Sequence, residues 1–177
     1  MKKLAVALMA VILVFSFAAC GGGSGGTQEV SFQGITMEIP SAWKAEESTL
    51  SDDYVIYEQK NKEGHDYRLL MQDTFGLLET YGGDMEKAGA FFKEVTEDDA
   101  SYSDVSDPVA GKFGDYDMHT ISCKLNMLNP DKEDLKATYP CKLIRIYMGD
   151  HDVEIEFSAQ EGDFEAFDQA FDAASIE

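Results

Sequence analysis

Residues 141–157 have the sequence CKLIRIYMGDHDVEIEF, which holds the clearest strand pattern in the chain. Its first part, Cys141–Met148, is rich in Ile, Leu and Tyr, and its last part, Val153–Phe157, alternates apolar residues with glutamates. Gly149–Asp152 supplies turn-forming residues between them. Because alternation of apolar and polar residues indicates a strand with one buried face, this stretch predicts an antiparallel hairpin.

Further strands are predicted on both sides of the Asn61–Gly64 turn and elsewhere in the chain. Ile35–Ile39 alternates apolar and polar residues until Pro40. The remaining predicted strands are Tyr54–Glu58, Tyr67–Met71 and Tyr116–Met127.

Two amphipathic helices are predicted. The first begins at Asp84, whose carboxylate can cap free N–H groups of the first turn, and runs to about Val95. Its apolar face comprises Met85, Ala88, Phe92 and Val95. The second helix is expected over Asp163–Ala174, with an apolar stripe of Phe164, Phe167, Ala170, Phe171 and Ala174. We expect both helices to cover one face of an antiparallel sheet, which defines an α+β fold.

The strand Ile35–Trp43, with the pattern I-x-M-x-I-P-x-x-W, resembles the opening of PsbP/Mog1-like α/β/α sandwich domains. The strand Val153–Phe157, followed by Phe167, Phe171 and Ser175-Ile176, is similar to their closing strand and helix. The resemblance extends from about Val30 to the end and implies a curved antiparallel sheet with helices on both faces. It also implies a role in binding or assembly rather than catalysis, and it transfers no functional residue.

The amino terminus has the features of an export signal. Lys2 and Lys3 precede the apolar run Leu4–Phe17, which is short for a permanent membrane span. Residues 17–20 (FAAC) resemble a bacterial lipobox, although Phe17 departs from its usual Leu. The resemblance implies removal of residues 1–19 and attachment of lipid, including palmitate, to Cys20. The alternative is an ordinary signal cleaved after Ala18.

The glycine-rich segment that follows is interpreted as a tether. Gly21–Gly26 matches G-x-G-x-x-G and G-x-S-x-G, but a helix is predicted after neither match, so both are coincidental. Residues 20–28 are therefore predicted to be the lipidated cysteine and a flexible spacer of about 16 Å. Residues 29–177 are predicted to form one α+β domain.

The charge excludes one class of partner. Loss of Lys2 and Lys3 would leave 12 basic residues against 34 acidic ones, a net charge of −22. Nucleic-acid binding needs a basic surface, so it is not expected. The predicted location is the outer face of the bacterial cytoplasmic membrane, where a spacer would hold the acidic domain away from anionic lipid.

Three groups of residues are candidate sites. Cys123 and Cys141 fall opposite each other if their strands, separated by Leu128–Tyr139, pair as a hairpin centred near Lys132. An exported protein permits a disulfide there, and the alternative is two buried thiols. The apolar cluster in TFGLLETY, residues 74–81, forms either a partner patch or part of the core beneath the nearby helix. Its members are Phe75, Leu77, Leu78 and Tyr81.

Few residues in the sequence indicate a metal site. His65-Asp66 and His151-Asp152 could bind a transition metal if their turns met, and Asp98, Asp99, Asp104 and Asp107 suit calcium in residue type. Each group is more simply interpreted as solvated loop residues, so no metal or cofactor is predicted.

The sequence therefore favours a non-catalytic binding or assembly role with an envelope protein as partner. The alternatives are a solute or metal receptor, which needs a roomy cleft, and a hydrolase, which needs two converging carboxylates with shifted pKa values.

Overall fold

The structure is a computed structural model that describes residues 26–46, 53–60, 65–129 and 132–176. The elements in these ranges are, in chain order, β1 Thr27–Phe32, β2 Ile35–Pro40, β3 Lys44–Ala45, β4 Tyr54–Lys60, β5 His65–Phe75, α1 Leu77–Thr80, α2 Met85–Asp98, β6 Tyr102–Ser103, β7 Val109–Phe113, β8 Tyr116–Asn129, β9 Lys132–Tyr147, β10 His151–Ala159, α3 Glu165–Asp172 and β11 Ser175–Ile176.

The strands form two antiparallel sheets. The large sheet has the order β3-β4-β5-β10-β9-β8-β6, with β7 also paired to β8, and the small sheet has the order β1-β2-β11. The predicted hairpin is confirmed as β9 and β10, in which Tyr147 lies opposite Asp152. β10 lies between β5 and β9 at the centre of the large sheet. The glutamates of β10 therefore lie in the middle of the sheet rather than at one of its edges.

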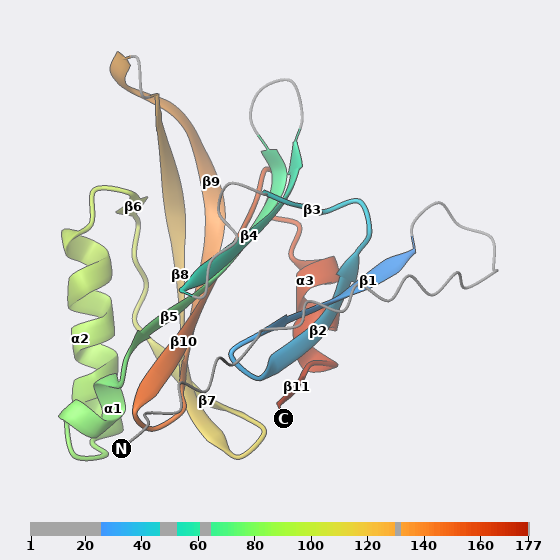
Figure 1. Cartoon of the computed structure of the whole chain (residues 1–177). Helices are drawn as coiled ribbons and strands as arrows, with labels where there is room; N and C mark the ends of the chain where they lie inside the picture. Colours follow the sequence, from blue (N-terminus) through green and yellow to red (C-terminus); the bar gives the residue numbers. More distant parts are fainter. Residues whose placement is uncertain (1–25, 47–52, 61–64, 130–131, 177) are drawn as a thin grey trace, which may run out of the picture.

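The two faces of the large sheet are covered differently (Figure 1). The small sheet and α3 pack on one face, where the rings of Phe157 and Phe167 stack with centroids 4.5 Å apart and Trp43 is fully buried. α2 packs on the other face through Ala88 and Phe92. The helices thus lie on opposite faces. The expectation from periodicity that both cover one face is wrong, whereas the two-sided arrangement implied by the resemblance is confirmed.

Both predicted helices are present. The side chain of Asp84 accepts a hydrogen bond from the backbone N–H of Lys87 at 3.1 Å, so the predicted cap is confirmed. α2 continues past the predicted end to Asp98, and Val95 is exposed whereas Thr96 is buried. The hydroxyl of Thr96 can be buried because it donates to the carbonyl oxygen of Phe92 at 2.8 Å.

Two predicted boundaries are wrong. Thr27 and Gln28, assigned to the tether, belong to β1, because Gln28 pairs with Ile39 and its side-chain amide donates to the carbonyl of Trp43. Leu128–Tyr139 is not a long connection, since β8 and β9 continue to the pair Asn129 and Lys132.

Several predictions fall on residues that the structure does not describe. The signal segment 1–19, Cys20, most of the tether and the Asn61–Gly64 turn are outside the described ranges. Among the residues that are described, no helix has the length and apolar character needed to span a membrane.

Candidate functional site

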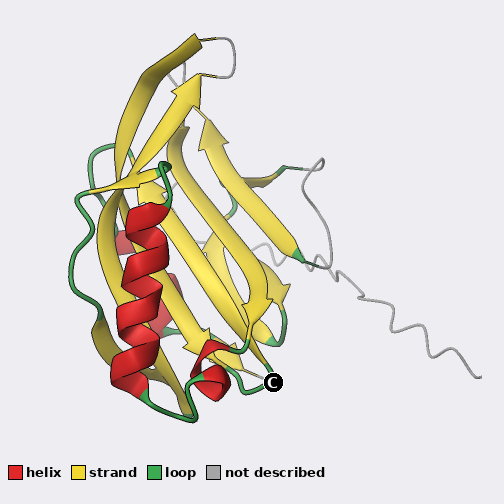
Figure 2. Ribbon diagram, turned by 90° about the vertical axis from the view of Figure 1, so that its left-hand side faces the viewer, coloured by secondary structure: helices red, strands yellow, loops and turns green. Residues whose placement is uncertain are grey.

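The face of the large sheet that carries α2 is only partly covered. α2 packs over β8 and β9, against Ile121 and Leu143, and the neighbouring strands remain uncovered beside it (Figure 2). We call this uncovered part the open strip. It consists of the α2-side positions of β4, β5 and β10, which are Tyr54, Ile56, Glu58, Arg68, Leu70, Gln72, Thr74, Glu154 and Glu156.

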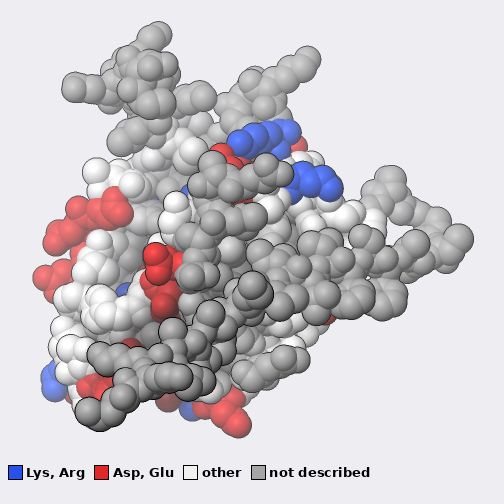
Figure 3. Space-filling view, in the orientation of Figure 1, with Lys and Arg blue, Asp and Glu red and all other residues white. Residues whose placement is uncertain are grey.

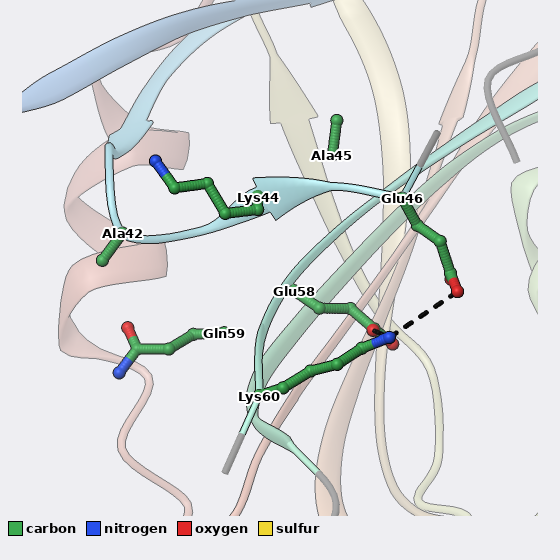
Figure 4. Close-up of a pocket in the computed structure, with 7 residues that line it drawn as sticks. All are labelled: Ala42, Lys44, Ala45, Glu46, Glu58, Gln59 and Lys60. Atoms are coloured by element: carbon green, nitrogen blue, oxygen red, sulfur yellow. Dashed lines mark ion pairs between the residues drawn. The ribbon is translucent and has the colours of Figure 1, made fainter. Parts of the chain in front are cut away.

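A row of ion pairs crosses the open strip. Lys60 bridges Glu46 at 3.6 Å and Glu58 at 3.0 Å, and Figure 4 shows its ammonium group pointing between these carboxylates. Arg68 pairs with Glu58, at 3.6 Å, and with Glu156. The row connects the β3 edge with the central strand β10, so the charges are held by three neighbouring strands.

The row ends in a small hollow of about 370 Å³. The hydroxyl of Tyr102 donates to Glu156 at 2.5 Å, and burial together with this carboxylate raises the pKa of Tyr102. The hollow is lined by Arg68, Leu70, Ser101, Tyr102, Leu125, Asn126, Met127 and Glu156. It therefore combines a charged floor with apolar walls.

A second charged cluster is buried at the other end of the strip. Arg145 Nε donates to Asp152 Oδ2 at 3.0 Å, and Arg145 Nη1 lies 3.6 Å from Glu154 Oε2. Burial raises the pKa of Asp152 and of Glu154, although Arg145 opposes both shifts. Asp152 also accepts the backbone N–H of Leu77 at 2.8 Å. The cluster thus ties the start of α1 to the sheet.

An aromatic patch lies directly over this cluster. Phe75 is 58% exposed, and its ring lies 6.4 Å from that of Phe91, which in turn lies 5.9 Å from Tyr81. We define the aromatic patch as Phe75, Leu78, Tyr81 and Phe91, all of them exposed or half-buried. Leu77 is fully buried, so its predicted place in a surface patch is wrong, because its N–H is bonded inward to Asp152.

Sequence reasoning missed most of these residues. Arg145 stands alone in an apolar run, Leu143–Tyr147, and a lone charge in such a run is a signal for a buried ion pair. Phe91 was overlooked because the next residue, Phe92, already accounted for the apolar face of the helix. No local pattern indicates that Tyr102 reaches Glu156, which is 54 residues away.

The prediction that the two cysteines lie opposite each other on paired strands is confirmed. Cys123 and Cys141 lie opposite each other on β8 and β9, and both are buried free thiols. The hydrogen bond with Cys123, together with burial, raises the pKa of Cys141. Opposite positions on paired strands have the Cα separation that a disulfide needs. The disulfide itself stays a prediction.

The histidine–aspartate pairs do not form a metal site. His151 lies opposite Phe75, at the far end of β5 from His65, and ten residues of strand span about 33 Å. Asp152, predicted at a turn, is instead buried in the sheet. No cluster of three metal-ligating side chains occurs within the described ranges.

The acidic loop also lacks calcium-site geometry, because its carboxylates bind other groups. Asp104 pairs with Lys124 at 2.5 Å and Asp107 with Lys93 at 2.7 Å, while Asp99 accepts the N–H of Ser101 at 2.8 Å. These contacts support the interpretation of this segment as a solvated loop. Along the edge that α2 forms in Figure 3, carboxylates are more evident than basic groups.

The carboxylates of the open strip do not have the arrangement expected of a hydrolase. The two carboxylates with raised pKa values are Asp152 and Glu154, but Asp152 is fully buried, where its Oδ2 accepts from Arg145 and from the N–H of Leu77. A general acid needs a partner that is free to act on substrate.

Comparisons with known proteins find similarity in structure alone. No protein-family model matches the sequence, and no curated protein matches it. The Ran-binding protein Mog1p of Saccharomyces cerevisiae superposes with a TM-score of 0.57 at 12% identity, over 86% of this chain and 96% of that one. The cyanobacterial PsbP of Synechocystis superposes with a TM-score of 0.54 at 13% identity, over 90% and 98%. The chain therefore has a Mog1- and PsbP-like α+β fold.

Proposed function

We propose that this chain is a lipoprotein, anchored through Cys20 to the outer face of the bacterial cytoplasmic membrane, whose domain binds an envelope protein without catalysis. The observation that carries the binding role is the exposure of Phe75 in the aromatic patch. Exposed aromatic clusters are typical of protein interfaces. The fold agrees with this role, since the structurally similar Mog1p is a Ran-binding protein.

The aromatic patch is held rigidly, which favours binding. Arg145 donates to the carbonyl oxygen of Phe75 at 3.1 Å, and its guanidinium lies 5.2 Å from the centre of the Phe75 ring. Gly76 packs so closely that a Cβ there would lie 2.5 Å from the carbonyl oxygen of Gly149. A surface fixed before binding loses little conformational entropy when a partner docks.

The patch also points away from the proposed anchor. The chain enters the domain at Thr27 in β1, which packs on the face of the large sheet opposite α2 (Figure 1). The aromatic patch lies between α1 and α2 on the other face. A domain tethered at β1 would therefore carry the patch on the face of the large sheet opposite to its point of attachment.

Metabolic labelling tests the anchor. Cells that express the chain are fed an alkyne analogue of palmitate, and the purified protein is probed for the label. We expect label on the wild-type chain and its loss in Cys20→Ser. Equal labelling of the two chains, or a mature terminus at Ala19, would reject lipid attachment at Cys20.

Site-specific crosslinking in the host tests the binding role. A photoreactive benzophenone side chain is placed at position 75, and a matched one at Val109, which is 68% exposed and outside the patch. We expect one dominant envelope protein to be captured from position 75 and not from position 109. The same captured proteins at both positions would indicate random encounter and contradict docking at the patch.

A further inference from the structure

The nearly buried charges beside α2 do not balance. Four carboxylates lie there with side chains less than 15% exposed, namely those of Glu58, Asp152, Glu154 and Glu156. Two guanidinium groups, of Arg68 and Arg145, oppose them, and Lys60 adds a third positive charge from the exposed edge. With all four carboxylates ionised, one negative charge is uncompensated in the cluster where Asp152 and Glu154 share Arg145, and an uncompensated charge in a poorly solvated place is costly.

The geometry around Asp152 agrees with this shortage of positive charge. Its Oδ2 accepts from Arg145 and from the N–H of Leu77, but its Oδ1 is buried without a hydrogen-bond partner. The raised pKa values of Asp152 and Glu154 have the same origin, since burial disfavours their ionised forms. Glu154 is 14% exposed at the open strip, so positive charge brought there would favour its ionised form, whereas Asp152 is fully buried.

The hollow beside Tyr102 has the shape and chemistry for such a charge. Its apolar wall includes Leu70, Leu125 and Met127, and its charged end is the carboxylate of Glu156. Long basic side chains bury their aliphatic stems along apolar surface and keep the cationic head at a polar group. A lysine or arginine side chain satisfies both parts of this lining.

The open strip is long enough for more than one such side chain. Arg68 and Phe75 are seven residues apart on β5, which is about 23 Å of strand. Glu154 lies between the hollow and the aromatic patch, and Gln72 donates to it at 3.0 Å. At the far end, Arg145 already places a guanidinium 5.2 Å from the centre of the Phe75 ring, so this ring accepts a cation.

We propose that the open strip binds an extended, basic polypeptide segment of the partner, with a lysine or arginine side chain in the hollow between Arg68, Tyr102 and Met127. The inference rests on the proposed protein-binding function and adds the chemistry of the partner. The acidic character of the whole domain would speed the encounter, and the hollow would provide the specificity.

The test uses the full mature chain in micelles of neutral detergent at physiological salt. The probe is a fluorescent peptide of alternating glycine and lysine, about eight residues long so that it spans the strip. Binding is measured by anisotropy, with a peptide of acetylated lysines and free spermidine as comparison ligands. We expect the lysine peptide to bind and the acetylated peptide not to bind.

Three variants separate the hollow from general charge attraction. Met127→Trp fills the hollow without changing charge, and Glu156→Gln removes its carboxylate. Asp172→Asn removes an equal charge from an exposed position on α3, on the opposite face. We expect the first two to weaken binding on the order of tenfold or more and the third by less than about twofold. If Glu156→Gln fails to fold, Met127→Trp decides.

Three outcomes would overturn the inference. Unchanged binding by Met127→Trp would show that the hollow is not used, and equal weakening by Glu156→Gln and Asp172→Asn would show attraction by net charge alone. If spermidine displaced the lysine peptide as strongly as expected from its charge alone, the strip would bind cations in general and not a polypeptide segment. Each result is separate from the proposed function, because a partner captured from position 75 would still establish protein binding at the aromatic patch.

Discussion

Arg145 and Phe75 come from strands that are not neighbours in the chain, yet the guanidinium of Arg145 supports both the ring and the backbone carbonyl of Phe75. The distances are 5.2 Å to the ring centre and 3.1 Å to the carbonyl oxygen. The same guanidinium neutralises Asp152. One buried side chain thus fixes the position of an exposed aromatic residue.

Replacing Arg145 by methionine is expected to destabilise the domain by about 3–5 kcal/mol, because Asp152 and Glu154 would remain buried without a cation. Urea unfolding followed by circular dichroism measures this loss. Lys93→Met, which breaks the more exposed pair with Asp107, is the control and should have a much smaller effect on stability. Similar losses in the two variants would show that the Arg145 cluster has no special role.

Truncation of Leu77 is expected to lower the stability of the domain much more than truncation of Phe75. Leu77→Ala removes a fully buried side chain and should lower the free energy of unfolding by about 2–5 kcal/mol. Phe75→Ser removes an exposed ring and should change it by about 1 kcal/mol or less while weakening the binding of the partner that is captured from position 75. If Phe75→Ser unfolded the domain, Phe75 would belong to the core and the aromatic patch would lose its meaning.

Glu154 gives a pH dependence with a definite sign. Burial raises its pKa from 4.5, so the folded chain holds this proton more tightly than the unfolded chain does. The resulting stability is fully present below pH 4.5 and is lost as the pH rises through the folded-state pKa. Glu154→Gln removes this loss. The free energy of unfolding of the variant, relative to that of the wild type, should therefore rise as the pH rises from 4.5 toward neutrality. Unfolding curves at several pH values test this, and a constant or falling difference would contradict it.

The cysteine pair should be sensitive to oxidation. Cys123 and Cys141 lie opposite each other, so thiol–disulfide exchange with an oxidised oxidoreductase can join them without moving either strand. We expect protein isolated from the envelope to show neither thiol after denaturation and to lose about 3 kcal/mol of stability on reduction. Two titratable thiols in the denatured, unreduced protein would instead establish a reduced pair.

Gly89 provides a test of how closely α2 packs on the sheet. A Cβ at this position would lie 2.8 Å from Nε2 of His119, whose other ring nitrogen is hydrogen-bonded to the Tyr147 hydroxyl at 2.8 Å. Helix propensity alone would make Gly89→Ala stabilising by about 1 kcal/mol. We expect a net destabilisation of about 1–3 kcal/mol, because the buried imidazole must move. A stabilised variant, measured by thermal unfolding, would show that α2 can shift outward at little cost.

Much of the fold was predictable because its signals are local. The alternation in Val153–Phe157, the cap at Asp84 and the apolar stripe from Phe164 to Ala174 each act within one strand or one helix, and each element is present. The register of Cys123 and Cys141 followed from the symmetry of a hairpin. Val95 was misplaced because the period of a helix predicts which residues share a face but not where the neighbouring layer ends.

The candidate site was largely beyond local prediction. The alternation in their strand predicts that Glu154 and Glu156 face solvent, but both side chains are nearly buried even though no helix covers them. Their nearly buried state depends on β10 lying between β5 and β9, and on side chains that come from distant segments. Phe75 and Leu77 carry the same apolar signal, but Leu77 is buried in the core beside α2, where its N–H donates to Asp152, whereas Phe75 is exposed.

The sequence by itself determined where the main strands and the helices α2 and α3 form, most of their apolar faces and the strongly acidic character of the domain. These properties depend on neighbours within a few residues or on composition alone. The tertiary structure decided the order of the strands, and with it the meeting of Arg145 with Phe75 and of Tyr102 with Glu156. Such contacts join residues 54 to 70 positions apart, and they form only where packed layers leave room for them and bury their charges together.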